Sequence, residues 1–349
     1  MTAWLGTEDS VLDWLRSLAG RFEVFFPQPN GAANFNFAPV HNGSMLRFDA
    51  YRPSVVPPVK RLLPAYEVIF QFSRGAEGRY EFHQQRDGRR QVLAGVRPCD
   101  LKGIAQMDAV FADGYPDPLY LSHRTNTAIV AYACPQPCDD TCFCESVESL
   151  DFRDGADLFL TPDGDDLLIE TMTLRGEALL AGTSFASCDE PEAVLGRAIA
   201  RRPRPFGRQL KATPGALPAI LAGAGNSPAW TKHAERCYSC TTCNLVCPTC
   251  YCFDVQDDFN SDLTSGMRTR TWDACMSPAF AEVTGGHNFR AACADRHRHR
   301  VRRKFEYLPK RYGMGSFCVG CGRCGRQCTA NIDIFDIVND IIDETGGTR

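Results

Sequence analysis

Two runs of four closely spaced cysteines constrain this chain more than any other feature of its 349 residues. The first run is Cys237-Tyr-Ser-Cys240-Thr-Thr-Cys243-Asn-Leu-Val-Cys247-Pro, with the spacing C-x2-C-x2-C-x3-C-P. The second run, near the carboxyl end, is Cys318-Val-Gly-Cys321-Gly-Arg-Cys324-Gly-Arg-Gln-Cys328. Two complete runs of this kind are typical of the ligands of two [4Fe–4S] clusters, whereas a lone C-x2-C would equally suit zinc.

The spacing also predicts how the thiols are shared between the two clusters. Three cysteines three residues apart can wrap one cubane, and the fourth lies beyond a bend and reaches the other cluster. We therefore expect the first cluster to take Cys237, Cys240, Cys243 and Cys328. We expect the second cluster to take Cys318, Cys321, Cys324 and Cys247.

The composition indicates that the thiols are reduced and bound to metal. The chain has 18 cysteines, which in a secreted protein would suggest disulfides, but its start, MTAWLGTEDS, lacks the basic and apolar regions of a signal peptide. No apolar run approaches the roughly 20 residues of a membrane-spanning helix. We therefore expect a cytoplasmic protein without a membrane span, and the net charge of −4 gives no reason to expect nucleic acid as a partner.

The first two thirds of the sequence predict an α/β arrangement. Residues 91–96 and 127–133 are apolar enough for buried strands, and a helix over 101–111 lies between them. Further expected elements are helices over 8–19 and 191–201 and strands over 21–26, 66–72 and near 157–160 and 166–170, with loop over 28–45 and a hairpin or loop over 75–90.

The last third has a different character. Past Trp230 cysteine, arginine and histidine become more frequent and strand signals fade, and the apolar spacing over 332–342 predicts an amphipathic helix. Residues 211–228, rich in Ala, Gly and Pro, are the candidate boundary. We expect an α+β protein with an α/β domain over 1–225 and a mainly α-helical dicluster ferredoxin domain over 226–349.

Five further cysteines follow the two buried strands, where an α/β sheet usually builds a site. They are Cys99, Cys134, Cys138, Cys142 and Cys144. Four of them would suffice for a third [4Fe–4S] cluster, but their spacing alone equally allows a zinc site or thiols packed as small apolar groups.

Several motifs together resemble one family over nearly the whole chain. They are Gly95-Val-Arg-Pro-Cys99-Asp100-Leu, Cys142-Phe-Cys144, Cys247-Pro-Thr-Cys250-Tyr-Cys252, Arg270-Thr-Trp272-Asp273-Ala-Cys275, Gly285-Gly-His287-Asn-Phe-Arg290 and the second cysteine run. The chain resembles the β subunit of soluble sulfhydrogenases, which are cytoplasmic NAD(P)-linked [NiFe] hydrogenases. It resembles equally the iron–sulfur A subunit of anaerobic sulfite reductase.

The resemblance implies an electron-transfer subunit without catalytic residues of its own. Such a subunit relays electrons between a flavin subunit that binds FAD and NAD(P)H and the small and large subunits of a [NiFe] hydrogenase, or a sirohaem subunit. The absence of a phosphate-binding glycine motif agrees with nucleotide and flavin sites on another chain. The resemblance also assigns the third cluster to Cys99, Cys134, Cys142 and Cys144 and leaves Cys138 out. The sequence departs from the family at Thr329, where proline usually follows the last cysteine.

Some residues keep two interpretations. Cys250, Cys252 and Cys275 are either packed thiols or a further ligand set, and the latter would suit a polysulfide or disulfide reductase. A zinc-stabilised binding module is the remaining alternative for the chain as a whole. His287 is expected to be structural rather than an iron ligand, and Cys188 and Cys293 are expected to be plain thiols.

Residues 296–304, Arg-His-Arg-His-Arg-Val-Arg-Arg-Lys, are the most basic stretch of the chain. They predict either a solvated surface or a face that offsets the charge of the clusters or docks an acidic partner. Near the second run, Gly320, Gly322 and Gly325 either permit the turns alone or also bring backbone N–H groups close to cluster sulfur.

Overall fold

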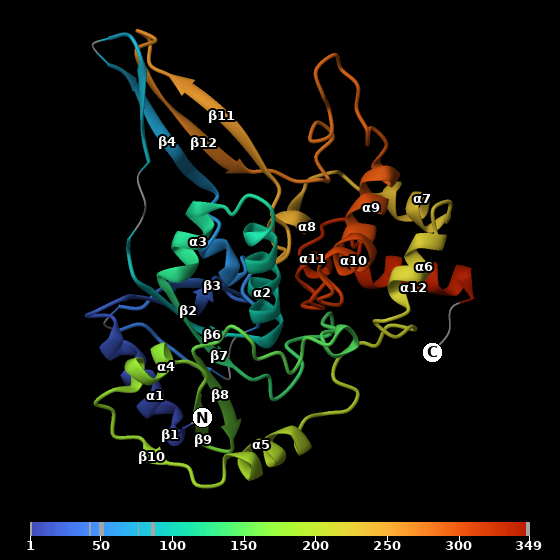
Figure 1. Ribbon diagram of the computed structural model, residues 1–349. Helices are drawn as coiled ribbons and strands as arrows, with labels where there is room; N and C mark the ends of the chain where they lie inside the picture. Colours follow the sequence, from blue (N-terminus) through green and yellow to red (C-terminus); the bar gives the residue numbers. More distant parts are fainter. Residues whose placement is uncertain (1, 42, 49–51, 76, 85–87, 347–349) are drawn as a thin grey trace.

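The protein is an α+β molecule, seen in a computed structural model that describes residues 2–41, 43–48, 52–75, 77–84 and 88–346 (Figure 1). Its strands are β1 (Ala3–Thr7), β2 (Glu23–Asn30), β3 (Asn34–Pro39), β4 (Tyr66–Arg74), β5 (Tyr80–His83), β6 (Gln91–Val96), β7 (Thr127–Tyr132), β8 (Leu158–Asp163), β9 (Asp166–Thr171), β10 (Ala186–Ser187), β11 (Phe253–Phe259) and β12 (Ser265–Trp272). Its helices are α1 (Glu8–Leu18), α2 (Pro98–Ala112), α3 (Pro118–Thr125), α4 (Leu174–Leu180), α5 (Pro191–Ala200), α6 (Leu217–Gly223), α7 (Ala229–Ala234), α8 (Thr242–Leu245), α9 (Cys293–Arg302), α10 (Leu308–Tyr312), α11 (Arg323–Arg326) and α12 (Ile334–Thr345). Three short turns are η1 (Pro58–Arg61), η2 (Glu145–Val147) and the π-helical η3 (Arg303–Tyr307).

An eight-stranded mixed sheet organises the N-terminal part, in the order β10-β1-β9-β8-β7-β6-β2-β3. Strands β2, β6, β7 and β8 run parallel, and β6 and β7 are buried along their whole length. In β6, Val92 and Ala94 face the core that α1 covers, and Leu93 and Val96 face the core that α2 and α3 cover. A parallel strand with helices on both faces has no polar side, which is why the sequence shows continuous apolar runs here.

The loop expected over residues 28–45 is wrong, because β3 lies within it and pairs antiparallel with β2. The strand expected over 21–26 is also too short, because β2 continues through Pro27 to Asn30. Beyond Phe25 the register of β2 pairs only with β3, so Pro27 and Pro29 need no hydrogen bond on the other side. Proline is tolerated in a strand that has one unpaired edge. The sequence pattern does not show which part of β2 has such an edge, so the prolines suggested a loop.

A four-stranded antiparallel sheet, in the order β11-β12-β4-β5, projects from the molecule (Figure 1). It joins β4, from the first quarter of the chain, to a hairpin that lies between the two cysteine runs. The expectation of helix and loop after Trp230 therefore missed two strands. Every residue of β11 is exposed, yet Phe253, Val255 and Phe259 alternate with polar residues, and this short alternation is the strand signal that the sequence analysis overlooked.

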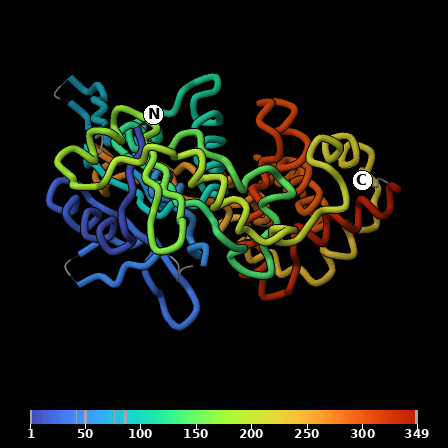
Figure 2. The backbone as a smooth tube through the Cα atoms, turned by 90° about the horizontal axis from the view of Figure 1, so that it is seen from below, coloured from blue at the N-terminus to red at the C-terminus, as the bar shows by residue number. Residues whose placement is uncertain are grey.

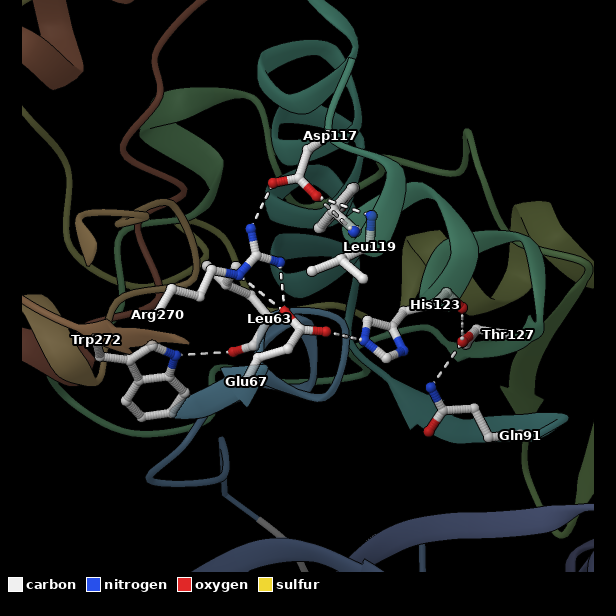
Figure 3. Close-up of polar contacts among 10 residues, drawn as sticks. Leu63, Glu67, Gln91, Asp117, Leu119, His123, Thr127, Arg270 and Trp272 are labelled. Atoms are coloured by element: carbon white, nitrogen blue, oxygen red, sulfur yellow. Dashed lines mark hydrogen bonds and ion pairs between the residues drawn. The ribbon is translucent and has the colours of Figure 1, made fainter. Parts of the chain in front are cut away.

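A partly buried ion-pair network around the buried Arg270 fixes the base of this projecting sheet to the N-terminal part (Figure 3). The Arg270 guanidinium on β12 pairs with Glu67 on β4 and with Asp117 at the start of α3. His123 Nε2 lies 2.6 Å from the Glu67 carboxylate, and the Trp272 indole N–H donates to the Leu63 carbonyl at 2.8 Å. The start of β11 and the end of β12 are therefore held in a defined position.

The C-terminal helices form a separate apolar core. It contains Leu217 and Leu221 of α6, Trp230 of α7, Val301 of α9 and the buried face of α12. The helix predicted over 332–342 is confirmed as α12. In the view from below, the N-terminal part and the C-terminal helices lie side by side (Figure 2). The domain boundary near residue 225 stays a prediction. Within the described ranges, no helix has the length and apolarity needed to cross a bilayer.

Candidate metal centres

The two cysteine runs fold into loops of the same shape. In each, the residues on both sides of the second cysteine have positive φ: 54° and 65° at Ser239 and Thr241, and 66° and 71° at Gly320 and Gly322. A short helix then begins, α8 after the first loop and α11 after the second. Left-handed backbone costs non-glycine residues about 1–2 kcal/mol each, so the first loop stores strain that its packing must offset.

The structure brings most of the expected ligands of these two loops together. Around the second loop, the charge of Cys247, which belongs to the first loop, contributes to the pKa of each of Cys318, Cys321 and Cys324. Around the first loop, the charge of Cys328 from the second loop contributes to the pKa of Cys237, and the charge of Cys237 contributes to the pKa of Cys243. Cys240 is exposed at the rim of the first loop. Burial raises the pKa of Cys243 to about 12, so binding of metal there must displace a proton.

The five N-terminal cysteines line one small pocket, together with Cys321 of the second loop. The two buried parallel strands explain this, because β6 leads directly to Cys99 in the first turn of α2 and β7 leads to Cys134. The predicted set of Cys99, Cys134, Cys142 and Cys144 is thus brought together. Cys138, which the resemblance left out, lies in the same pocket and forms a hydrogen bond with Cys134. A hydrogen bond with Cys144 lowers the pKa of Cys142 to about 7, although burial opposes this shift.

The second loop packs tightly on this N-terminal pocket. The Phe143 N–H donates to the Gly320 carbonyl at 2.8 Å, and a Cβ at Gly320 would lie 2.7 Å from the backbone of Cys144. A Cβ at Gly322 would lie 2.2 Å from Thr141 Oγ1. These glycines therefore do more than permit turns, because they let two cysteine loops approach at backbone contact.

A fully buried ion pair joins the same two regions. Arg323 of α11 is 0% exposed and makes two hydrogen bonds to the Asp100 carboxylate, at 2.5 and 2.7 Å, and one to the Ser54 carbonyl at 2.6 Å. A fork-shaped pair with satisfied donors is the geometry in which a buried charge is stable. The pair holds the first turn of α2, which carries Cys99, against the helix that follows Cys321.

The basic stretch 296–304 is not a solvated surface. Arg296, Arg300 and Lys304 are spaced four residues apart, so they share one face of α9 and η3. Each of them is no more than 4% exposed. Among the described residues, no carboxylate pairs with Arg300 or Lys304, and Lys304 Nζ lies 3.2 Å from Cys247 Sγ. This agrees with the expectation of a face that offsets cluster charge.

The electrostatics support anionic groups at this place. Burial acts to lower the pKa of Lys304, but the Cys247 and Cys250 thiolates outweigh it and raise that pKa above its ordinary value. A hydrogen bond from Cys250 holds the pKa of Cys247 well below its usual range. Buried cations without carboxylate partners are costly, and thiolate-bound iron–sulfur clusters, which are anionic, fit them well.

Sequence reasoning missed two features near the first loop. Cys293 was expected to be a plain thiol, but among the described residues its sulfur lies within 4.8 Å of ligand atoms of Cys237 and His297. His297 is 2% exposed, neither ring nitrogen has a hydrogen-bond partner, and burial lowers its pKa to about 3. His287, by contrast, is exposed and packs edge-on against Phe289, and its structural role stays a prediction. The four-residue spacing of Cys293 and His297 on α9 was the available signal.

Comparison with known proteins now defines the class. A family model described as a 4Fe–4S dicluster domain matches residues 236–332, which contain both cysteine runs. The fold and the site are therefore those of an iron–sulfur protein that binds [4Fe–4S] clusters. The chain is also 31% identical over 318 residues to sulfhydrogenase 2 subunit beta of Pyrococcus furiosus, a match that covers 87% of this chain and 91% of the relative. It belongs to the sulfhydrogenase β-subunit family. No solved structure matches the chain.

Proposed function

We propose that this chain is a cytoplasmic electron-relay subunit of an NAD(P)-linked [NiFe] hydrogenase. It would pass electrons between a flavin subunit that binds FAD and NAD(P)H and the small and large hydrogenase subunits. Membership in the sulfhydrogenase family supports this role, since the relative is named as the beta subunit of a sulfhydrogenase. The 18 free thiols agree with a reducing compartment.

The observation that carries the proposal is a continuous series of thiol sites. Cys321 belongs to the second loop and also lines the N-terminal pocket. Cys247 of the first loop interacts electrostatically with Cys318 of the second, and Cys243 of the first loop does so with Cys324 of the second. The series ends at the exposed Cys240, where a partner can approach.

When bound, [4Fe–4S] clusters supply one-electron chemistry at potentials tuned by nearby charge, hydrogen bonds and burial. The residues of this chain would hold the thiolates, exclude water and place positive charge beside them. Lys304 and Arg300 lie on one side of the second set of thiols, and Arg323 lies next to Cys321. Such charges stabilise an added electron.

We propose three clusters, with the three ligand sets that the sequence analysis gave. The N-terminal set is tested by comparing two serine variants of the full chain, prepared anaerobically. Cys142→Ser should lose about four iron atoms per chain, because it removes a ligand of one cubane. Cys138→Ser should lose none. The reverse result would assign the fourth ligand to Cys138 instead.

The relay itself is tested in the assembled complex. Cys321→Ala and Cys243→Ala should each abolish NAD(P)-linked hydrogen turnover while dye-linked hydrogenase activity of the catalytic subunits persists. Cys188→Ala, at a half-buried thiol near β10, is the control and should leave both activities unchanged. Survival of NAD(P)-linked turnover in both site variants would contradict the relay.

The second candidate is the same relay in an anaerobic sulfite reductase, favoured by the equal resemblance of the sequence motifs. The subunits that co-purify with the chain discriminate between the two, because nickel indicates a hydrogenase and sirohaem a sulfite reductase. A polysulfide or disulfide reductase would instead require turnover by the isolated chain.

A further inference from the structure

A separate group of thiols lies beside the second loop, at the base of the β11–β12 hairpin. Cys250 and Cys252 come directly before β11, and Cys275 follows β12. The hairpin register pairs Phe253 with Trp272, and the Asp273 N–H donates to the Cys252 carbonyl at 3.0 Å. Cys275 and Cys252, which are 23 residues apart in sequence, thereby line the same pocket as Cys250.

The pocket is built from donors to sulfur and from cations. The buried Asn244 side-chain amide donates to Cys250 Sγ and to Cys275 Sγ, at 3.3 Å in each case. Arg300, Arg303 and Lys304 also line the pocket, together with Thr249, Tyr251 and Leu308. Hydrogen bonds to thiolate sulfur and nearby positive charge are the usual surroundings of a thiolate-bound metal centre.

Two cations of this pocket have no carboxylate partner among the described residues, although Lys304 Nζ also donates to Thr249 Oγ1 at 2.8 Å and lies 3.2 Å from Cys247 Sγ. Arg300 and Lys304 are each 3% exposed, and no carboxylate pairs with either one in the described part of the chain. A third buried cation, Lys60, donates to the Cys250 carbonyl at 2.7 Å and lies 4.7 Å from the centre of the Trp272 ring. Lys304 and Arg300 also face the second set of thiols, so an anionic centre here would share these cations with the second cluster.

The arrangement is too wide for one zinc ion. Four sulfur ligands at 2.3 Å from zinc lie about 3.8 Å apart in tetrahedral geometry. The sulfur atoms of Cys250, Cys252 and Cys275 do not all lie within 4.8 Å of one another, although all three residues are described. Cysteine ligands of an iron–sulfur cluster lie further apart, because each binds a different iron.

We propose that Cys250, Cys252 and Cys275 hold a further iron–sulfur cluster of three or four irons. This chain supplies three thiolates to it, because Cys247, which forms a hydrogen bond with Cys250, is needed by the second loop. The additional cluster would thus lie next to the second one, with the Cys247 and Cys250 sulfurs between them. Its existence does not depend on the proposed partners, but its role as part of a relay rests on the proposed function.

The test is the metal content of a Cys252→Ser/Cys275→Ser variant of the full chain, prepared anaerobically. Iron and acid-labile sulfide should fall by three to four atoms each per chain, about the content of one cluster, and one set of EPR features should disappear. Cys188→Ser is the matched control and should keep the iron content of the unsubstituted chain. Unchanged iron in the double variant, loss of one zinc instead of iron, or a Cys252–Cys275 disulfide would each overturn the proposal.

A second variant decides the matter if the first does not fold. Cys99→Ser/Cys134→Ser removes two thiols of the N-terminal pocket and leaves the hairpin base unchanged. With that pocket emptied, the two loops alone account for about eight irons per chain, and the proposed cluster raises this to about 11–12. A count of eight would overturn the proposal. Because these readouts are metal counts and the relay is measured by turnover, each proposal can fail without the other.

Discussion

Replacement of Arg323 tests the buried ion pair between the second cysteine loop and α2. Arg323→Met leaves the Asp100 carboxylate buried without its partner, and this costs about 3–5 kcal/mol in proteins. For 349 residues the entropy of unfolding is about 0.7 kcal/mol/K, so the melting temperature should fall by about 4–7 °C. The assay is anaerobic thermal unfolding of the iron-loaded chain followed by circular dichroism.

The double variant Arg323→Met/Asp100→Asn separates two explanations of this loss. If the cost arises from the unpaired carboxylate, removing its charge should restore at least half of the lost stability. Arg16→Met breaks an exposed pair with Asp13 and should change the melting temperature by less than about 1.5 °C. The reasoning is refuted if Arg323→Met costs less than about 2 °C. It is also refuted if the double variant is no more stable than the single one, since Arg323 would then act mainly through the Cys321 thiolate.

Two further predictions concern the surroundings of the cysteine loops. Lys304→Met removes a buried cation 3.2 Å from Cys247 Sγ, and it should lower one cluster midpoint potential by on the order of 100 mV. The assay is a redox titration followed by EPR. The exposed Lys310→Met is the control and should leave that potential nearly unchanged. Gly320→Ala should destabilise the chain by at least about 2 kcal/mol more than Gly313→Ala, which is about 3 °C in melting temperature. Both glycines have similar φ, but only at Gly320 would an added Cβ meet backbone, at 2.7 Å. Equal effects of the two lysine variants, or of the two glycine variants, would contradict the respective argument.

The sequence alone determined the chemistry of the C-terminal part. The cysteine spacing predicted [4Fe–4S] clusters, and the dicluster domain match confirms this class. The spacing works because a short loop that wraps a cubane has few possible forms, and both runs adopt the same one. The buried strands β6 and β7 were equally visible, because a strand covered on both faces must be apolar throughout.

Only the tertiary structure decided what the remaining cysteines and the basic stretch do. The β11–β12 hairpin brings Cys275 to Cys250 and Cys252, but the sequence of an exposed hairpin does not show which strands pair or which distant residues they bring together. The helical spacing of Arg296, Arg300 and Lys304 was present in the sequence, yet charge alone predicts exposure. Whether a cation faces water or buried thiolates depends on what packs against its helix, and that is a property of the folded chain.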